Sequence, residues 1–220
     1  MDKAVTMAVN YVCFKISFSL TLKPIIFLIA QRVLTELKIS LASEKRFKCV
    51  FINIFMNLEV KEFELKKDYF TITSGLYPLG PSRINRIINA VVPESYSNPE
   101  PLEDIKRIAR VDGSTLVFVT AAKNYVFHES EKITYFISLG IKDTGKHAGR
   151  TINIAVFLRE PLSFNSLVEL IKVITEAKCG ALMDFGLKIT GTVTDAVAVG
   201  TLNLVNDVVF AGTATPIGSE

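Results

Sequence analysis

The stretch TINIAVFL, residues 151–158, carries an apolar side chain at every second position from Ile152 to Leu158. Alternation with a period of two predicts a β-strand that buries one face. The strongest helical pattern in the chain follows it at residues 163–186. A strand that leads into a long amphipathic helix is typical of a protein that mixes α and β structure.

The helical segment 163–186, SFNSLVELIKVITEAKCGALMDFG, has signals for both of its ends. Ser163 is suited to cap the first turn, and Gly186 is suited to end the helix. The apolar residues between them fall on one stripe, which would face a core. The stripe consists of Leu167, Leu170, Ile171, Ile174, Ala181 and Leu182.

Further elements are predicted on both sides of this strand and helix. Apolar runs predict strands at 47–56, 63–74, 115–122, 132–140 and 207–213. Prolines and acidic residues predict a helix at 99–110, whereas 84–96 suits either a helix or a strand. Pro216 looks like the start of another helix, which the sequence would cut short. We predict a single α/β domain at 46–220, with a central mixed β-sheet and flanking helices, after an extension at 1–45.

The composition excludes several classes of protein. The 220 residues carry a formal net charge of +3 without a dense lysine or arginine block, so nucleic acid is not an expected partner. The cysteines Cys13, Cys49 and Cys179 are isolated, which argues against a disulfide scaffold and a structural zinc site and suits a reducing cytoplasm. Because the only histidines are His128 and His147, no His-rich metal centre is expected, and no cofactor is predicted.

The first part of the chain has an ambiguous pattern. Residues 4–30 are apolar but are interrupted by Lys15, Lys23 and Pro24. A membrane-spanning helix needs about 20 consecutive apolar residues, so a span is disfavoured here. A secretory signal also fits poorly, because Lys15 lies inside the apolar run. Three roles stay open for this segment: an extension outside the core, a packed terminal element and a membrane anchor.

The stretch TGTVTDAVAVG, residues 190–200, places three threonines and Asp195 ahead of an apolar run. An aspartate in such a run is unfavourable unless it is paired or exposed. Asp195 therefore either satisfies nearby backbone N–H groups in a turn or acts as a general base or ligand. Lys178 falls on the apolar stripe of the helix, so it either snorkels to solvent or points into a pocket. Glu176 lies about 200° round the helix from Lys178, so the two do not obviously serve one site.

Other polar residues interrupt apolar strands or lie in loops. Asn153 would either bridge two strands or orient a substrate amide and stabilise an oxyanion, and Thr120 has the same ambiguity. His128 and His147 are interpreted as solvated loop histidines in preference to acid–base groups. Cys179 is interpreted as an inert buried thiol. The sequence lacks the common dinucleotide, P-loop, α/β-hydrolase and zincin motifs.

Several segments taken together resemble the adenosylcobinamide amidohydrolase family. They occur in the order and spacing of that family, and the resemblance covers residues 70–220 approximately. The segments are TAA at 120–122, TINIAVFLREPLS at 151–163, TEAKCGAL at 175–182, TGTVTDAVAVG at 190–200 and AGTATPIGSE at 211–220.

The resemblance implies a cytoplasmic enzyme of corrinoid salvage, of a kind typical of archaea and some bacteria. Such an enzyme takes a small corrinoid substrate and hydrolyses the amide that joins the aminopropanol arm of adenosylcobinamide to the corrin ring. The products are adenosylcobyric acid and 1-amino-2-propanol. The alternative is a non-catalytic protein that binds a corrinoid or another small ligand.

The residues expected to carry this chemistry lie in the segments that resemble the family. Asp195 or Glu176 would activate water, or a threonine of the 190–194 loop would attack, with help from Lys178. The predicted catalytic residues are Asp195, Lys178, Glu176 and Thr194. The predicted substrate-binding residues are Asn153, Thr151, Thr120, Thr190, Gly191, Thr192 and Ser74. No metal ligand is predicted.

Overall fold

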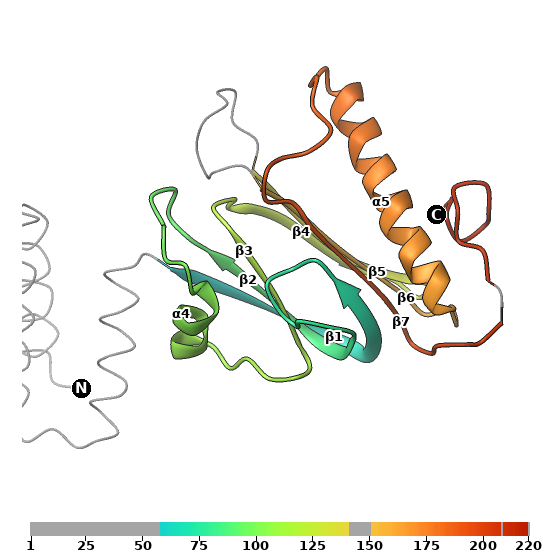
Figure 1. Ribbon diagram of the computed structural model, residues 1–220, viewed down its shortest axis with the longest axis horizontal. Coiled ribbons are helices and arrows are strands. Elements are labelled where there is room, and N and C mark those ends of the chain that lie inside the picture. The colour runs from blue at the N-terminus through green and yellow to red at the C-terminus, as the bar shows by residue number, and fades with distance from the viewer. Residues whose placement is uncertain (1–57, 141–150, 208, 220) are drawn as a thin grey trace, which may run out of the picture. The chain divides into compact units, whose positions relative to one another are not determined.

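A computed structural model describes residues 58–140, 151–207 and 209–219 (Figure 1). The predicted strand at 47–56, the extension at 1–45 and His147 lie outside the described residues. The described elements are, in chain order, β1 (Glu59–Thr73), β2 (Ser82–Val91), α4 (Pro101–Ile108), β3 (Thr115–Thr120), β4 (Asn124–Glu129), β5 (Ile133–Gly140), β6 (Thr151–Leu158), α5 (Phe164–Asp184) and β7 (Ala196–Thr201).

The described strands form one mixed sheet in the order β3-β2-β1-β7-β6-β5-β4. The pairs β2–β3 and β6–β7 are parallel, and the other neighbours are antiparallel. Each parallel pair is joined through a helix, α4 or α5, because two parallel strands need a long crossover connection. The predicted α/β class, with a mixed sheet and flanking helices, is confirmed.

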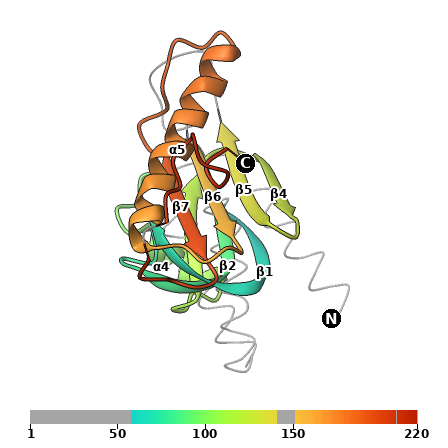
Figure 2. The same ribbon diagram turned by 90° about the vertical axis from the view of Figure 1, so that its right-hand side faces the viewer.

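The sheet curls so that its two ends approach each other across an inner face. The ring of Phe118 on the edge strand β3 stacks on Phe136 of β5, with ring centroids 6.0 Å apart. Phe63 of β1 packs against Phe127 of β4, with ring centroids 5.2 Å apart. These rings form part of an apolar core on the inner face. Figure 2 shows how strongly the strands twist across the sheet.

The helices cover different parts of the outer face. α5 crosses the sheet over β6 and β7, where Leu167 and Leu170 pack with Val197 and Val199 (Figure 1). α4 packs on the other part of the sheet, where Ile105 joins a core cluster of β2 and β3. The curled sheet thus has a core on its inner face and helices on its outer face.

Both predicted ends of the long helix are confirmed. The Ser163 hydroxyl accepts a hydrogen bond from the backbone N–H of Ser166 at 3.2 Å, which caps α5. Gly186, just past the helix, has a φ of +80°, a conformation that glycine adopts without strain. Among the described residues, no helix has both the length and the apolar character needed to cross a membrane.

The remaining element predictions have different outcomes. The strands at 63–74, 115–122 and 132–140 and the helix at 99–110 are confirmed as β1, β3, β5 and α4. The segment 84–96, which suited either a helix or a strand, begins inside the strand β2. No sequence pattern predicted β4, which places His128 on a strand and not in a loop.

The predicted strand at 207–213 is wrong, because its described residues form no strand. Side chains of α5 take up its backbone groups instead. The Ser166 hydroxyl donates to the carbonyl of Val209, and the Glu169 carboxylate accepts from the N–H of Ala211 at 2.8 Å. Backbone groups that form hydrogen bonds with side chains in this way are not available for the ladder of a β-strand.

Candidate functional site

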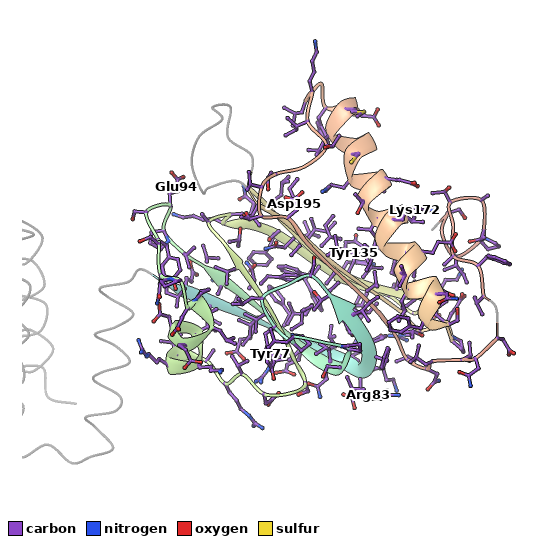
Figure 3. All side chains as sticks on the ribbon, in the orientation of Figure 1. Tyr77, Arg83, Glu94, Tyr135, Lys172 and Asp195 are labelled. Carbon is purple, nitrogen blue, oxygen red and sulfur yellow. The ribbon has the colours of Figure 1, made fainter. Side chains whose placement is uncertain are left out.

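Lys178 of α5 and Asp195, directly before β7, form an ion pair that is largely buried. The Lys178 Nζ lies 2.5 Å from Asp195 Oδ2, and the two side chains are 10% and 12% exposed. Figure 3 shows Asp195 near the head of β7. Lys178 therefore does not extend its ammonium group into solvent but pairs with Asp195, a second predicted catalytic residue.

Asp195 accepts four hydrogen bonds. Its Oδ2 accepts from Lys178 and from the N–H of Thr192 at 3.1 Å, while Oδ1 accepts from the Thr192 hydroxyl at 2.5 Å and from the N–H of Ile152 at 3.0 Å. Burial raises the pKa of Asp195, but the hydrogen bonds from Lys178, Thr192 and Ile152 outweigh burial and hold this pKa below its usual 3.8. Asp195 is therefore an anion at neutral pH, and it fills the predicted turn role as well as the ion pair.

Gly191 allows the loop to approach the ion pair closely. A Cβ atom at this position would lie 2.7 Å from Lys178 Nζ and closer still to Asp195 Oδ2. Any side chain here would push the two charged groups aside. Gly191 thus contributes to the candidate site by leaving room for the Lys178–Asp195 ion pair.

Lys178 also lines an apolar groove of about 910 Å³ between α5 and the outer face of the sheet. Ile174 and Leu182 of α5 form one wall, and β5 and β6 provide the floor. Tyr135 lies on this floor, and Figure 3 shows it beside α5. The groove gives the ion pair an apolar surface as its neighbour.

Asn153 and Thr151 face the opposite side of the sheet. Ile152 and Ile154 line the groove, so the alternation along β6 turns Thr151 and Asn153 to the inner face. The Thr151 hydroxyl lies 2.7 Å from that of Thr194, which is exposed. Asn153 is 1% exposed, and its Nδ2 has no hydrogen-bond partner among the described residues.

The other predicted site residues make local contacts. The Ser74 hydroxyl accepts from the N–H of Val197 at 3.0 Å, and the Thr120 hydroxyl accepts from the N–H of Ala122 at 2.9 Å. Thr190 is exposed, and its carbonyl accepts from the thiol of Cys179 at 3.1 Å. Within the part of the chain that the structure describes, the exposed Glu176 forms no hydrogen bond or ion pair with Lys178 or Asp195.

Sequence reasoning did not single out two further buried polar residues, Asn89 of β2 and Ser138 of β5. Both are 0% exposed. Neither amide atom of Asn89, nor the hydroxyl of Ser138, has a hydrogen-bond partner within the described ranges. Asn89 interrupts the apolar run IINAVV (87–92), which is the same signal that identified Asn153.

Comparison with known proteins identifies the family. A family model described as adenosylcobinamide amidohydrolase matches residues 61–220. The chain belongs to this family. The adenosylcobinamide amidohydrolase of Methanosarcina mazei is 31% identical to it over 172 residues, which cover 71% of this chain and 86% of that protein. No solved structure matches the chain.

Membership of the adenosylcobinamide amidohydrolase family makes the chain a hydrolase that acts on an amide bond. For that chemistry the site offers a cation held by an anion, a loop rich in threonine and an adjacent apolar groove. The described residues contain no group of three or more His, Cys, Asp or Glu side chains that could hold a metal ion. His128 is exposed on β4, where its ring packs on Tyr135 with centroids 5.1 Å apart.

Proposed function

We propose that this amidohydrolase cleaves the amide that links the aminopropanol arm of adenosylcobinamide to the corrin ring. The products are adenosylcobyric acid and 1-amino-2-propanol, and the reaction serves cobamide salvage in the cytoplasm. The observation that carries the proposal is the buried Lys178–Asp195 pair beside an apolar groove, in a chain of this family.

Lys178 provides the positive charge that the reaction needs. Hydrolysis of an amide requires a polarised carbonyl, a nucleophile and a proton for the departing amine. An ammonium group with little access to water interacts more strongly with a carbonyl oxygen than it would in bulk solvent. In this proposal Lys178 donates a hydrogen bond to that oxygen and is available to protonate the amine.

Asp195 positions Lys178. A general base works best when its pKa is close to the working pH, whereas the pKa of Asp195 is held below 3.8. Asp195 is therefore assigned to holding the ammonium group of Lys178 in place. The Thr192 hydroxyl donates to Asp195, so we assign it to the support of this pair. A water molecule is the nucleophile, and the proton that it releases replaces the one that Lys178 gives to the amine, so that the net reaction adds one water across the C–N bond. Thr194 and Glu176 are the predicted catalytic residues left to orient this water.

The groove supports a large, partly apolar substrate. Ligand pockets measure roughly 300–1,000 Å³ and are mostly lined by apolar side chains, with a few polar groups that fix the orientation. The groove beside Lys178, at about 910 Å³, falls in this range. We assign it to the apolar part of the corrinoid, which would bring the amide arm to the ion pair.

The test is to incubate the purified chain with adenosylcobinamide and to analyse the mixture by mass spectrometry. The expected result is the joint appearance of adenosylcobyric acid and 1-amino-2-propanol. Lys178→Met should abolish both products at the same protein concentration, while Lys172→Met on the exposed side of the same helix should not. A substrate that binds but is returned intact would identify a corrinoid-binding protein and end the hydrolase proposal.

A further inference from the structure

Among the described residues, several buried polar side chains on the inner face of the sheet have an atom without a hydrogen-bond partner, and three of them lie toward one end of that face. Asn89, Ser138 and Asn153 are 0%, 0% and 1% exposed. Both amide atoms of Asn89, the hydroxyl of Ser138 and the Nδ2 of Asn153 are without a partner among the described residues. An unpaired buried polar group is destabilising, so several of them at one place are a candidate site for a molecule that supplies the hydrogen bonds.

The strand registers place the three side chains on one face. Ser138 is the direct partner of Asn153 in the β5–β6 ladder, so their side chains are neighbours. Asn89 is the partner of Phe118, and the Phe118 ring stacks on Phe136, two positions before Ser138. Because side chains alternate along a strand, Phe136 and Ser138 share the inner face.

The direction of β1 shows that Asn89 lies at the same end of this face as Ser138. Lys66 of β1 forms an ion pair with Glu129 of β4 at 3.0 Å. Phe63, between Lys61 and Lys66 in β1, packs against Tyr125 nearer the other end of β4, with ring centroids 5.2 Å apart. Lys61, the partner of Asn89 in the β1–β2 ladder, therefore lies toward that opposite end of β4. That opposite end of β4 pairs with the part of β5 that contains Ser138.

This polar cluster lies close behind the molecular surface. Thr151 is two positions from Asn153 and shares its face, and the Thr151 hydroxyl is 2.7 Å from that of the exposed Thr194. Asp195 of the ion pair directly follows Thr194 in the chain. A substrate arm at the head of β6 and β7 would thus be near both the cluster and the ion pair.

We propose that Asn89, Ser138 and Asn153 bind a carboxamide group of the substrate. An asparagine amide carries donors and an acceptor, and a serine hydroxyl can do either, so together they complement the N–H and C=O groups of a carboxamide. All three side chains are uncharged, which suits a neutral carboxamide better than a carboxylate, whose burial needs a compensating charge. The inference rests on the proposed function, which supplies the amide substrate.

The test uses variants that delete the polar groups and keep the shape. Asn89→Leu should lower kcat/KM for adenosylcobinamide at least tenfold, while the urea midpoint of unfolding stays unchanged or rises. We expect no fall in the midpoint because none of the described residues forms a hydrogen bond with the Asn89 amide. Ser138→Ala removes only the hydroxyl and should lower kcat/KM at least threefold, again without a lower midpoint.

Thr134 provides a matched control. It lies on the same face of β5 at the opposite end, it is 0% exposed, and its hydroxyl also lacks a partner among the described residues. Thr134→Val should change the urea midpoint in the same direction as Asn89→Leu and leave kcat/KM unchanged. Both variants replace an unpaired buried polar group on the inner face by an apolar one, but Thr134 lies at the end of β5 away from Ser138.

Two results would overturn the proposal. One is a wild-type kcat/KM in both Asn89→Leu and Ser138→Ala, and the other is a loss of activity that appears only together with a lower urea midpoint. If the wild-type chain does not hydrolyse adenosylcobinamide, its binding is measured by titration calorimetry. Weaker binding by both variants, with full binding by Thr134→Val, would support the cluster although the proposed hydrolysis has failed. Equal binding by all variants would overturn it.

Discussion

The substitution Asp195→Asn removes one charge of the buried ion pair while keeping the size of the side chain. It leaves the ammonium group of Lys178 beside a neutral amide, on a side chain that is only 10% exposed. The hydroxyl and N–H of Thr192 and the N–H of Ile152 also donate to Asp195. An asparagine has one acceptor oxygen and an NH₂ group. Some of these N–H and O–H donors would therefore face the NH₂ group, which cannot accept a hydrogen bond from them.

The structure sets the size of the effect on stability. Removing one partner of a buried ion pair costs about 3–5 kcal/mol. Because the side chains retain 10% and 12% exposure, water compensates part of the loss, and we expect about 3 kcal/mol for Asp195→Asn. Lys178→Met leaves Asp195 with its donors from Thr192 and Ile152, so we expect a smaller loss of about 1–2 kcal/mol. Against a typical stability of about 5–15 kcal/mol, both variants should still fold.

The effect on turnover should be large in both variants. Without its anion, the ammonium group of Lys178 is no longer held in place, and without Lys178 the carbonyl oxygen loses its cation. We expect kcat to fall at least about a hundredfold in each, the scale of a general acid–base contribution. Lys172→Met is the matched control, because Lys172 is on the same helix, is 59% exposed and lies 3.9 Å from Glu169. Its loss should cost less than about 1 kcal/mol and leave kcat unchanged.

Urea unfolding followed by circular dichroism measures the stabilities, and initial rates with adenosylcobinamide measure kcat. Two outcomes would refute the reasoning. If Asp195→Asn unfolds within about 0.5 kcal/mol of the wild type, the pair does not contribute as a buried ion pair. If Asp195→Asn is destabilised as expected but keeps wild-type kcat, the pair is structural and the candidate site lies elsewhere.

Three further predictions concern pH, space and a remote carboxylate. The pKa of Asp195 is lowered from 3.8, so its charge contributes stability above about pH 4 that is lost as pH falls through the lower pKa of the folded state. The difference in urea midpoint between wild type and Asp195→Asn should therefore shrink in acid, and a constant difference would contradict this. Gly191→Ala would place a methyl group 2.7 Å from Lys178 Nζ and should lower kcat, whereas Gly180→Ala, in open space on α5, should not. Equal kcat values for the two variants in a kinetic assay would exclude a steric effect at Gly191. Asp104→Asn should lower the unfolding free energy by about 2–4 kcal/mol with kcat unchanged. The reason is that Asp104 is 1% exposed and accepts hydrogen bonds from Tyr96 at 2.8 Å and Arg107 at 3.0 Å. An unchanged urea midpoint would contradict this prediction.

The Lys178–Asp195 pair shows what the sequence could reveal about the site. Helical spacing put Lys178 on an apolar stripe, and an aspartate ahead of an apolar run needs a partner, so each residue was a candidate by itself. Lys178 and Asp195 become partners because of the way α5 crosses the sheet, and no local sequence pattern predicts that crossing. The role of Asp195 also depended on structure, because its pKa is lowered by donors from three places, Lys178 of α5, the Thr192 loop and β6.

The elements that sequence patterns missed share a physical cause. β4 is an edge strand with mostly exposed side chains, so it lacks the burial that produces alternation. Residues 207–213 are apolar enough to suggest a strand, but Ser166 and Glu169 of α5 occupy their backbone groups. In both cases tertiary contacts decide the local structure, and propensity alone is a weak guide.

The head of β6 connects the two halves of the proposed chemistry. Ile152 donates its N–H to Asp195 on the outer face, and the next residue, Asn153, turns its amide to the inner face. The ion pair and the polar cluster are therefore fixed to adjacent residues of one strand, and that strand is paired on both sides, by β5 and β7. A shift of β6 by one residue would exchange the two faces and destroy both sets of contacts at once. The register of this strand, which TINIAVFL sets through its alternation, thus determines where the charges and the amide groups stand relative to each other.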